Sequence, residues 1–199
     1  MVRLSPGILI LTLLALLAAC TPPPSKYPYA SEPDPRRSAY VIGVGDQLSI
    51  SVWRNNDLGT TAIVRPDGAI TLALIGDVLA AGKTTKELEE TLIERLGGFI
   101  KSDTLSVTVA VTETAYNVFV SGNANGPGVY DSRRCLRVSE VVTMAGGVNE
   151  FASPNDTIVI RIAPDGTVHR IPVQLEEVMA GRRLDQDIVL LRGDRVYIP

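Results

Sequence analysis

The sequence contains few of the side chains that enzymes commonly use for catalysis. It has one histidine, His169, among 199 residues, so a Ser-His-Asp or Cys-His arrangement would have to use this residue. His169 falls in an expected strand, which favours a structural place in a sheet. The adjacent pairs Glu89-Glu90 and Glu176-Glu177 lie on expected helices, where neighbouring positions do not face each other. The chain is therefore not expected to be an enzyme.

The composition also argues against a metal centre and a nucleic-acid partner. Structural zinc sites need clustered ligands, and the chain has two cysteines and one histidine. The net charge is −3, so no basic field attracts nucleic acid. Aromatic residues make up 5% of the chain and Trp53 is the single tryptophan, which argues against a large stacking platform for bases or sugars. No metal, cofactor or nucleic acid is expected.

The one long apolar run lies at the N-terminus. Residues 8–17 are almost entirely apolar and follow Met1-Val2-Arg3, which is the pattern of a secretory signal peptide. The run is shorter than the roughly 20 residues of a membrane-spanning helix. It ends in Leu17-Ala18-Ala19-Cys20, which resembles a bacterial lipobox. The resemblance implies that residues 1–19 are removed and that Cys20 carries a covalent lipid; a plain signal peptide with an incidental cysteine is the alternative.

The other cysteine and the prolines give two further expectations. If Cys20 is acylated, Cys135 has no partner within the chain and is expected either as a small buried side chain or in a disulfide between subunits. Six prolines fall between residues 20 and 38, a composition typical of an extended, largely polyproline II tether without a core. Residues 20–38 are therefore predicted to hold the folded part away from the membrane surface.

The first folded unit is predicted over residues 39–113. Strands are expected at residues 47–53, 62–64, 69–72, 74–78 and 105–111. The turn Arg65-Pro66-Asp67-Gly68 predicts a β-hairpin between the second and third of these. Thr84 and Glu87 have the spacing of a capping box at the start of a helix. The apolar face of this helix, which Gly97-Gly98 ends, contains Leu88, Leu92, Ile93 and Leu96.

The second folded unit is predicted over residues 114–199. Strands are expected at residues 117–120, 158–162, 168–173, 188–191 and 196–198. Pro164-Asp165-Gly166 joins two of these strands as a hairpin. A short helix is expected at residues 138–145, closed by Gly146-Gly147, and one or two helical turns at 175–179. Both units combine hairpin-type strands with one main helix, so the fold class is α+β.

Glycine-rich turns are the remaining candidate sites. A dinucleotide-binding glycine loop opens a helix, whereas Gly43-Val44-Gly45-Asp46 and Gly193-Asp194 each lead into a strand. Gly126-Pro127-Gly128 lacks the Lys-Ser/Thr of a phosphate loop. These turns are interpreted as structural turns, in which glycine allows a positive φ or a close approach of two chain segments. No ligand is expected at them.

Linked motifs run through both units. The first unit contains Tyr40-x-Ile42-Gly43-x-Gly45-Asp46-x-Leu48-x-Ile50-x-Val52-Trp53, Val64-Arg65-Pro66-Asp67-Gly68-x-Ile70-x-Leu72 and Ile75-Gly76-Asp77-Val78. The second contains Val118-x-Val120-x-Gly122, Gly126-Pro127-Gly128-x-Tyr130, Ala145-Gly146-Gly147 and Gly193-Asp194-x-Val196-Tyr197-Ile198-Pro199. The series resembles the outer-membrane polysaccharide export lipoproteins, in which a polysaccharide export domain precedes a soluble-ligand-binding β-grasp domain.

The resemblance implies a transport function. Members of this family form rings, often octameric, that carry capsular polysaccharide or exopolysaccharide through the periplasm and the outer membrane. Their partner is an inner-membrane co-polymerase with an associated tyrosine kinase. The chain is accordingly expected at the outer membrane, anchored by lipid, with its folded domains in the periplasm. A non-conducting periplasmic scaffold that binds a glycan or another ligand is the alternative.

Two details depart from, or add to, the family pattern. The best-known members carry further β-grasp repeats and a C-terminal amphipathic helix, whereas this chain stops at Pro199. A short form is therefore expected, which forms a periplasmic ring and passes polymer to a separate outer-membrane β-barrel. Arginines are expected at subunit or lumen surfaces, where polar groups suit a hydrated polymer, with ordinary solvation as the alternative. These are Arg54, Arg65, Arg133 and Arg134.

Overall fold

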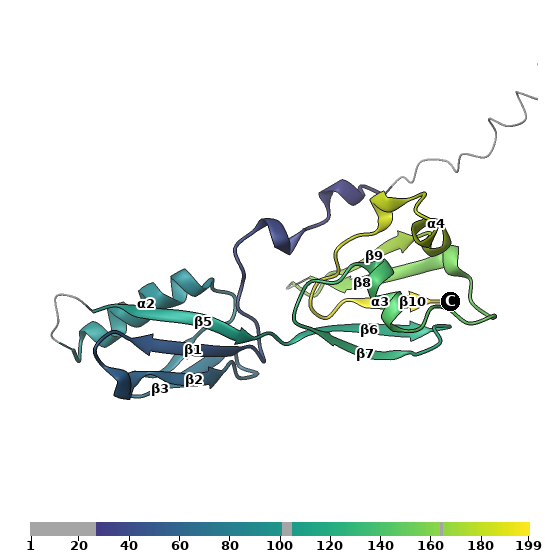
Figure 1. Ribbon diagram of the computed structural model, residues 1–199. Coiled ribbons are helices and arrows are strands. Elements are labelled where there is room, and N and C mark those ends of the chain that lie inside the picture. Colours follow the sequence, from purple (N-terminus) through teal and green to yellow (C-terminus); the bar gives the residue numbers. More distant parts are fainter. Residues whose placement is uncertain (1–26, 101–104, 164) are drawn as a thin grey trace, which may run out of the picture.

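The computed structural model describes residues 27–100, 105–163 and 165–199. The predicted signal peptide, the lipid attachment site Cys20 and Pro164 of the expected second hairpin lie outside these residues. The described chain forms two domains that lie end to end, and an N-terminal segment runs along the second domain before entering the first (Figure 1). The class is α+β, as the sequence predicts. Among the described residues no helix combines the length and the apolar content needed to cross a bilayer.

A three-stranded antiparallel sheet and one helix make up most of the first domain. The elements are β1 (Gln47–Val52), β2 (Thr60–Ile63), β3 (Ala69–Leu72), β4 (Gly76–Leu79), α2 (Thr85–Gly97) and β5 (Val107–Glu113). Strand β1 lies between β2 and β5. Its inward residues Leu48, Ile50 and Val52 are at most 3% exposed and share one core with α2. The predicted alternation of this strand is therefore confirmed.

The capping box of α2 forms as predicted. The Thr84 side chain accepts a hydrogen bond from the Glu87 N–H, and a Glu87 carboxylate oxygen accepts one from the Thr84 N–H at 2.7 Å. The helix buries Leu88, Leu92 and Leu96 as expected. Placing Ile93 on the same face was wrong, because this side chain is 36% exposed at the margin of the buried stripe. Two turns of regularly spaced leucine are enough to dock the helix.

The hairpin predicted around Arg65-Pro66-Asp67-Gly68 is wrong in its pairing. The turn itself exists, since the Gly68 N–H donates to the Arg65 carbonyl at 2.8 Å. However, β2 pairs with β1, whereas β3 pairs with β4 in a separate two-stranded sheet. Turn residues determine where a chain bends, but the partner of each strand depends on core contacts made elsewhere in the domain.

The second domain is a five-stranded mixed sheet with its helices on one face. The elements are β6 (Tyr116–Gly122), β7 (Gly128–Ser132), α3 (Val138–Met144), β8 (Thr157–Ile162), β9 (Val168–Val173), α4 (Leu175–Met179) and β10 (Arg195–Ile198). The strand order is β7-β6-β10-β8-β9, with β10 parallel to β6. The predicted β8–β9 hairpin is confirmed. Strand β7 was not predicted, and residues 188–191 form no regular strand, because only Val189 makes a bridge, to Arg137.

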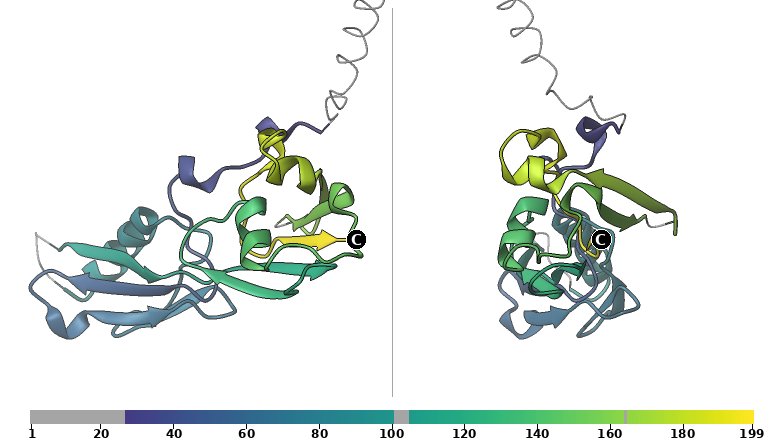
Figure 2. Two further views of the ribbon diagram at one scale, coloured as in Figure 1. Left: turned by 45° about the vertical axis from the view of Figure 1, so that its right-hand side comes forward. Right: turned by 90° about the vertical axis from the view of Figure 1, so that its right-hand side faces the viewer.

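The N-terminal segment corrects the prediction of a free tether. Within residues 27–38 the chain forms the 3₁₀ turns η2 (Tyr29–Ser31) and η3 (Pro35–Arg37). Tyr29 is 9% exposed, belongs to the core of the second domain, and donates its hydroxyl to the Pro172 carbonyl of β9 at 2.5 Å. The prolines shape this segment, but its tyrosines dock it. The described half of the predicted tether is therefore part of the folded body (Figure 2).

The two sheets differ in their helix-free faces. In the first domain this face carries small hydroxyl side chains on β1 and β5, such as Ser51 and Thr108, which lie opposite each other. In the second domain it carries Phe119, Val129 and Tyr197 together with two arginines. The helix-free face of the first sheet therefore carries mainly polar side chains with Ile63 as an exposed apolar one, whereas that of the second sheet carries more large apolar side chains.

Candidate functional site at the joint between the domains

The two Gly-Asp turns have the same construction. In the first, the Asp46 carboxylate accepts from the Gly43 N–H at 2.8 Å, and the Asp46 N–H donates back to the Gly43 carbonyl at 3.2 Å. In the second, Asp194 makes the same reciprocal pair with Leu191, at 2.7 and 3.1 Å. Gly45 and Gly193 have φ of 86° and 84°, a region that favours glycine. Both turns end in a buried aspartate at the start of a strand.

The first turn connects the two domains. Asp46 is fully buried and also accepts hydrogen bonds from the Tyr40 hydroxyl at 2.5 Å and from the Ala115 N–H of the interdomain link at 3.0 Å. Its ion-pair partner is Arg192, at 2.7 Å, which belongs to the second turn. Burial and the hydrogen bond to Asp46 raise the pKa of Tyr40, which therefore stays protonated. The Asp46 carboxylate, at the start of β1, therefore contacts both the interdomain link at Ala115 and the second domain at Arg192.

Arg192 lies directly against the first turn. Its guanidinium also donates to the Val44 carbonyl and to the Tyr40 hydroxyl, both at 2.9 Å. A Cβ placed on Gly43 would lie 2.0 Å from an Arg192 nitrogen, so a side chain at Gly43 would displace the arginine. Turns were predicted at both places. No local pattern indicated that Arg192 links them, because Arg192 lies 146 positions after Asp46 in the chain.

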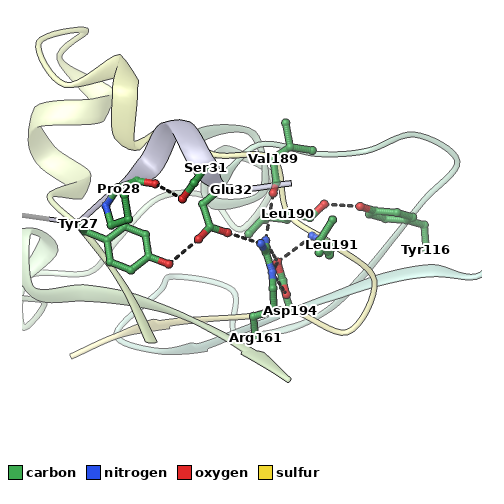
Figure 3. A network of polar contacts seen from close by, with 10 residues as sticks. All are labelled: Tyr27, Pro28, Ser31, Glu32, Tyr116, Arg161, Val189, Leu190, Leu191 and Asp194. Atoms are coloured by element: carbon green, nitrogen blue, oxygen red, sulfur yellow. Dashed lines mark hydrogen bonds and ion pairs between the residues drawn. The ribbon is translucent and has the colours of Figure 1, made fainter. Parts of the chain in front are cut away.

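The second turn holds a buried arginine from β8. Arg161 is 7% exposed and donates Nη2 and Nε to Asp194 at 2.6 and 3.0 Å. Its Nη1 donates to Glu32 of the N-terminal segment at 2.5 Å, and Tyr27 donates its hydroxyl to the same carboxylate. Figure 3 shows Arg161 between Glu32 and Asp194, with a further bond to the Val189 carbonyl. Arg161 therefore fastens the N-terminal segment to the second turn.

Burial sets the protonation of this network. It raises the pKa of Asp194, and the Arg161 cation opposes that rise. Burial, together with the neighbouring Glu32 carboxylate, raises the pKa of Tyr27 to about 12. The phenol therefore remains a hydrogen-bond donor to Glu32. Both arginines of the joint are already paired with carboxylates, which leaves neither available as a ready anion site.

A cleft of about 660 Å³ opens beside the joint. Its walls come from the N-terminal segment, from β8 and β9, and from the second turn. They include Tyr40, Cys135, Arg161, His169 and Arg192. Cys135 is half-buried and free, and it packs against the core of the second domain. His169 is exposed on β9, as its expected place in a sheet suggested.

The other predicted motif residues lie in two further places. Arg65, Asp67 and Asp77 form an exposed ion-paired cluster at the turn before β3, with Gly68 at φ 80°. Gly126-Pro127-Gly128 and Gly146-Gly147 meet in a loop cluster at the end of the second domain, where the Gly126 N–H donates to the Ala145 carbonyl at 2.8 Å. The structure thus brings together Gly43, Gly45, Asp46, Gly193 and Asp194, but it does not bring these other motifs to the joint.

The four arginines expected at surfaces are all at least partly exposed. Arg54 and Arg133 form no ion pair among the described residues, whereas Arg134 pairs with Glu140 at 2.7 Å. The described chain also contains no group of three or more His, Cys, Asp or Glu side chains suited to a metal ion.

Residues 34–112 match the family described as polysaccharide biosynthesis/export protein, and residues 117–172 match the SLBB domain, in that order. The chain belongs to the polysaccharide export protein family. The joint described above therefore lies between its export domain and its SLBB domain. The matched family is described by polysaccharide biosynthesis and export, which is a transport family rather than an enzyme family; that this chain has no catalytic activity stays a prediction.

Two curated proteins are similar to this chain. It is 30% identical over 150 residues to the exopolysaccharide production protein ExoF of Rhizobium meliloti strain 1021, an alignment that covers 69% of this chain and 33% of the relative. It is 24% identical over 182 residues to the EPS I polysaccharide export outer membrane protein EpsA of Ralstonia solanacearum, covering 79% and 47%. The chain spans a third to about half of the length of these curated relatives.

Replacing Glu32 tests the attachment of the N-terminal segment to the SLBB domain. Glu32→Gln removes the charge that pairs with Arg161 but keeps the side-chain size, and it leaves Asp194 as the remaining partner of the arginine. We expect residues 27–38 to exchange amide hydrogens at least several-fold faster, with the protection of β6 and β10 unchanged. Hydrogen exchange read by mass spectrometry measures this. Glu150→Gln, at an exposed position, is the control, and unchanged exchange in 27–38 would contradict the assigned role of Glu32.

Proposed function

We propose that this protein exports capsular polysaccharide or exopolysaccharide across the cell envelope as a homo-oligomeric ring. It is held at the outer membrane by a lipid on Cys20, with its folded domains in the periplasm. The observation that carries the proposal is the order of the export and SLBB domains over residues 34–172. The name of the EpsA relative, an outer membrane export protein, supports the location.

The joint supports a ring of fixed geometry. A closed ring requires every subunit to present its two contact surfaces at the same angle. The Asp46–Arg192 ion pair and the docked N-terminal segment restrict the angle between the domains. A loosely linked pair of domains would have no such preferred angle. Rigid subunits of this kind suit a closed assembly better than a flexible binding module.

The helix-free face of the SLBB sheet supports contact between copies. Val129 and Tyr197 are 55% and 42% exposed there, and Phe119 lies between them in the sheet. Contiguous apolar side chains on a soluble domain are typical of protein contact surfaces. A second copy of the same chain is the occupant that a ring requires.

The proposed partners follow from the family resemblance. They are an inner-membrane polysaccharide co-polymerase with its tyrosine kinase, the exported polymer, and a separate outer-membrane β-barrel that receives it. The proposed membrane anchor is the lipid on Cys20. Several acyl chains bind a membrane stably, whereas a single chain binds only marginally. Cys20→Ser is expected to leave the protein unacylated, and mass spectrometry of the mature N-terminus tests this directly.

Export and assembly are tested together. A strain lacking the protein is expected to retain polymer inside the cell, and the purified protein is expected to give a closed-ring mass by native mass spectrometry. Val129→Glu is expected to reduce the ring to monomers, because it places a charge in the apolar face. Leu184→Glu is the matched control, because Leu184 is 63% exposed, against 55% for Val129, and lies on the other side of the domain. Normal secretion without the protein would refute the export role.

A periplasmic scaffold that binds a ligand is the second candidate. The cleft of about 660 Å³ beside the joint favours it, because small-molecule sites commonly occupy such spaces between domains. A scaffold would be monomeric and would bind its ligand saturably. Native mass therefore separates the two candidates.

A further inference from the structure

The single tryptophan stands exposed on the helix-free face of the export domain. Trp53 follows β1 and is 64% exposed. Its backbone is held in place, since its N–H donates to the Ser106 carbonyl at 2.9 Å and its carbonyl accepts from the Asn55 side chain at 3.1 Å. The backbone at Trp53 is thus held, and most of the indole ring is exposed to solvent. An exposed indole offers a flat aromatic face against which a ligand ring can pack.

Hydroxyl groups extend from Trp53 along the same face. The antiparallel register places Ser51 opposite Thr108 and Ser49 opposite Thr61. Ser106 lies opposite Trp53 itself. Within the described chain none of these hydroxyls has a side-chain hydrogen bond to protein. They form a row of donors and acceptors that can bond to a polar ligand.

Arg54 completes the surface. It is exposed and forms no ion pair among the described residues, and it has a φ of 61°, which is unusual for a residue other than glycine. Strained backbone of this kind collects at functional positions. A groove of about 370 Å³ is lined by Ser51, Val52, Trp53, Arg54, Ser106 and Thr108, and Arg54 is the charged residue among these described lining residues.

We propose that this groove binds a sugar ring of the exported polymer, and that it favours an acidic sugar. The sugar C–H groups would lie on the electron-rich face of Trp53, because such a face attracts weakly positive hydrogens. The sugar hydroxyls would bond to the Ser51, Ser106 and Thr108 row, and Arg54 would pair with a carboxylate substituent. The inference rests on the proposed export function and names a contact that this function requires.

The contrast between the two open faces favours a glycan over a protein partner here. The SLBB face presents Phe119, Val129 and Tyr197, which suit a dry contact between subunits. Around Trp53 the neighbouring side chains are serine and threonine, which stay hydrated and would be costly to bury in such a contact. One ring with hydroxyl neighbours suits weak, repeated contact with a passing hydrated chain.

The test uses Trp53 as its own reporter. Because it is the only tryptophan, the intrinsic fluorescence of the full-length protein reports this groove alone. The probe is oligosaccharide made by partial hydrolysis of the secreted polysaccharide of the host strain. We expect saturating probe to shift the emission to shorter wavelength and to reduce iodide quenching about threefold. Carboxyl-reduced probe is expected to bind about fivefold more weakly. Equal binding of both probes would overturn the preference for acidic sugar.

Variants separate this site from the export function. By calorimetry, Trp53→Ala is expected to weaken binding about tenfold and Trp53→Phe less, while Phe151→Ala, exposed elsewhere, has no effect. In cells, Trp53→Ala is expected to slow secretion of a complemented deletion strain. Two results together would overturn the proposed sugar site but not the export function. They are full restoration of secretion by Trp53→Ala in the deletion strain, and no protection of Trp53 from iodide when the parent protein is mixed with the probe. A deletion strain that still secretes would instead overturn the proposed function.

Discussion

Arg161→Ala is expected to destabilise the protein by about 3–5 kcal/mol, because it leaves buried carboxylates without their cation. Asp194 is 1% exposed, and Arg161 donates to it twice. The Glu32 carboxylate loses the same partner. Replacing both members of such a group by apolar residues can be nearly neutral, but removing one member is not. Urea unfolding followed by far-UV circular dichroism measures the loss.

The control for this variant is Arg182→Ala. Arg182 pairs with Glu177 at 2.6 Å, but its side chain is 58% exposed, so the expected change in the free energy of unfolding is small. Trp53 fluorescence reports unfolding of the export domain and should shift less than circular dichroism in the Arg161 variant. If Arg161→Ala and Arg182→Ala lowered the free energy of unfolding equally, the cost assigned to leaving buried carboxylates unpaired would be contradicted.

The loss in Arg161→Ala should depend on pH. Burial raises the pKa of Asp194, and removal of the opposing cation raises it further. A carboxyl whose pKa is higher in the folded than in the unfolded state stabilises the fold at low pH, and that contribution disappears as pH rises through the folded pKa. The difference between variant and parent should therefore be largest near neutral pH. It should shrink as pH falls toward the ordinary aspartate pKa of about 3.9.

Asp46→Ala is expected to release the export domain from the SLBB domain. The change leaves the Gly43 and Ala115 N–H groups without the buried carboxylate that accepts from them, and Arg192 without its ion-pair partner. The expected cost is about 3–5 kcal/mol, with a separate effect on shape because the ion pair spans the joint. Small-angle X-ray scattering should show a larger and broader distribution of dimensions. The Trp53 and circular dichroism transitions should also separate.

Two further substitutions serve as comparisons for Asp46→Ala. Asp67→Ala removes an exposed carboxylate that pairs with Arg65, and it should leave both the scattering and the stability nearly unchanged. Asp46→Asn keeps an acceptor for one N–H group but loses the charge. Its stability and its scattering dimensions should therefore lie between those of the parent and those of Asp46→Ala. An unaltered scattering curve for Asp46→Ala would mean that the joint does not depend on this residue.

Local patterns in the sequence predicted the local structure well. Alternation identified β1 and β5, and the Thr84–Glu87 spacing identified the start of α2. The Gly-Asp turns were recognised as turns leading into strands, which the structure confirms. These features depend on residues within a few positions of one another, where backbone sterics and capping bonds act directly.

Long-range partners were not predictable in this way. The strand of Thr157–Ile162 has three isoleucines on one face, yet the opposite face, with Val159 and Arg161, is the buried one. Arg161 can be buried because Asp194 and Glu32, 33 and 129 positions away, neutralise it. The docking of residues 27–38 was missed for the same reason, since proline content reports stiffness but not the pocket that receives Tyr29. An arginine at an inward strand position was the one available signal.

With the proposed lipid on Cys20, the docked N-terminal segment would reverse the order of the domains relative to the membrane. The described chain begins at Tyr27, against the SLBB domain, and only afterwards reaches the export domain. From a lipid on Cys20, seven residues of fully extended chain reach about 25 Å at most. The domain that comes second in the sequence would therefore stand nearest the outer membrane. The export domain would project toward the cell interior, and polymer would meet Trp53 first and the SLBB domain last.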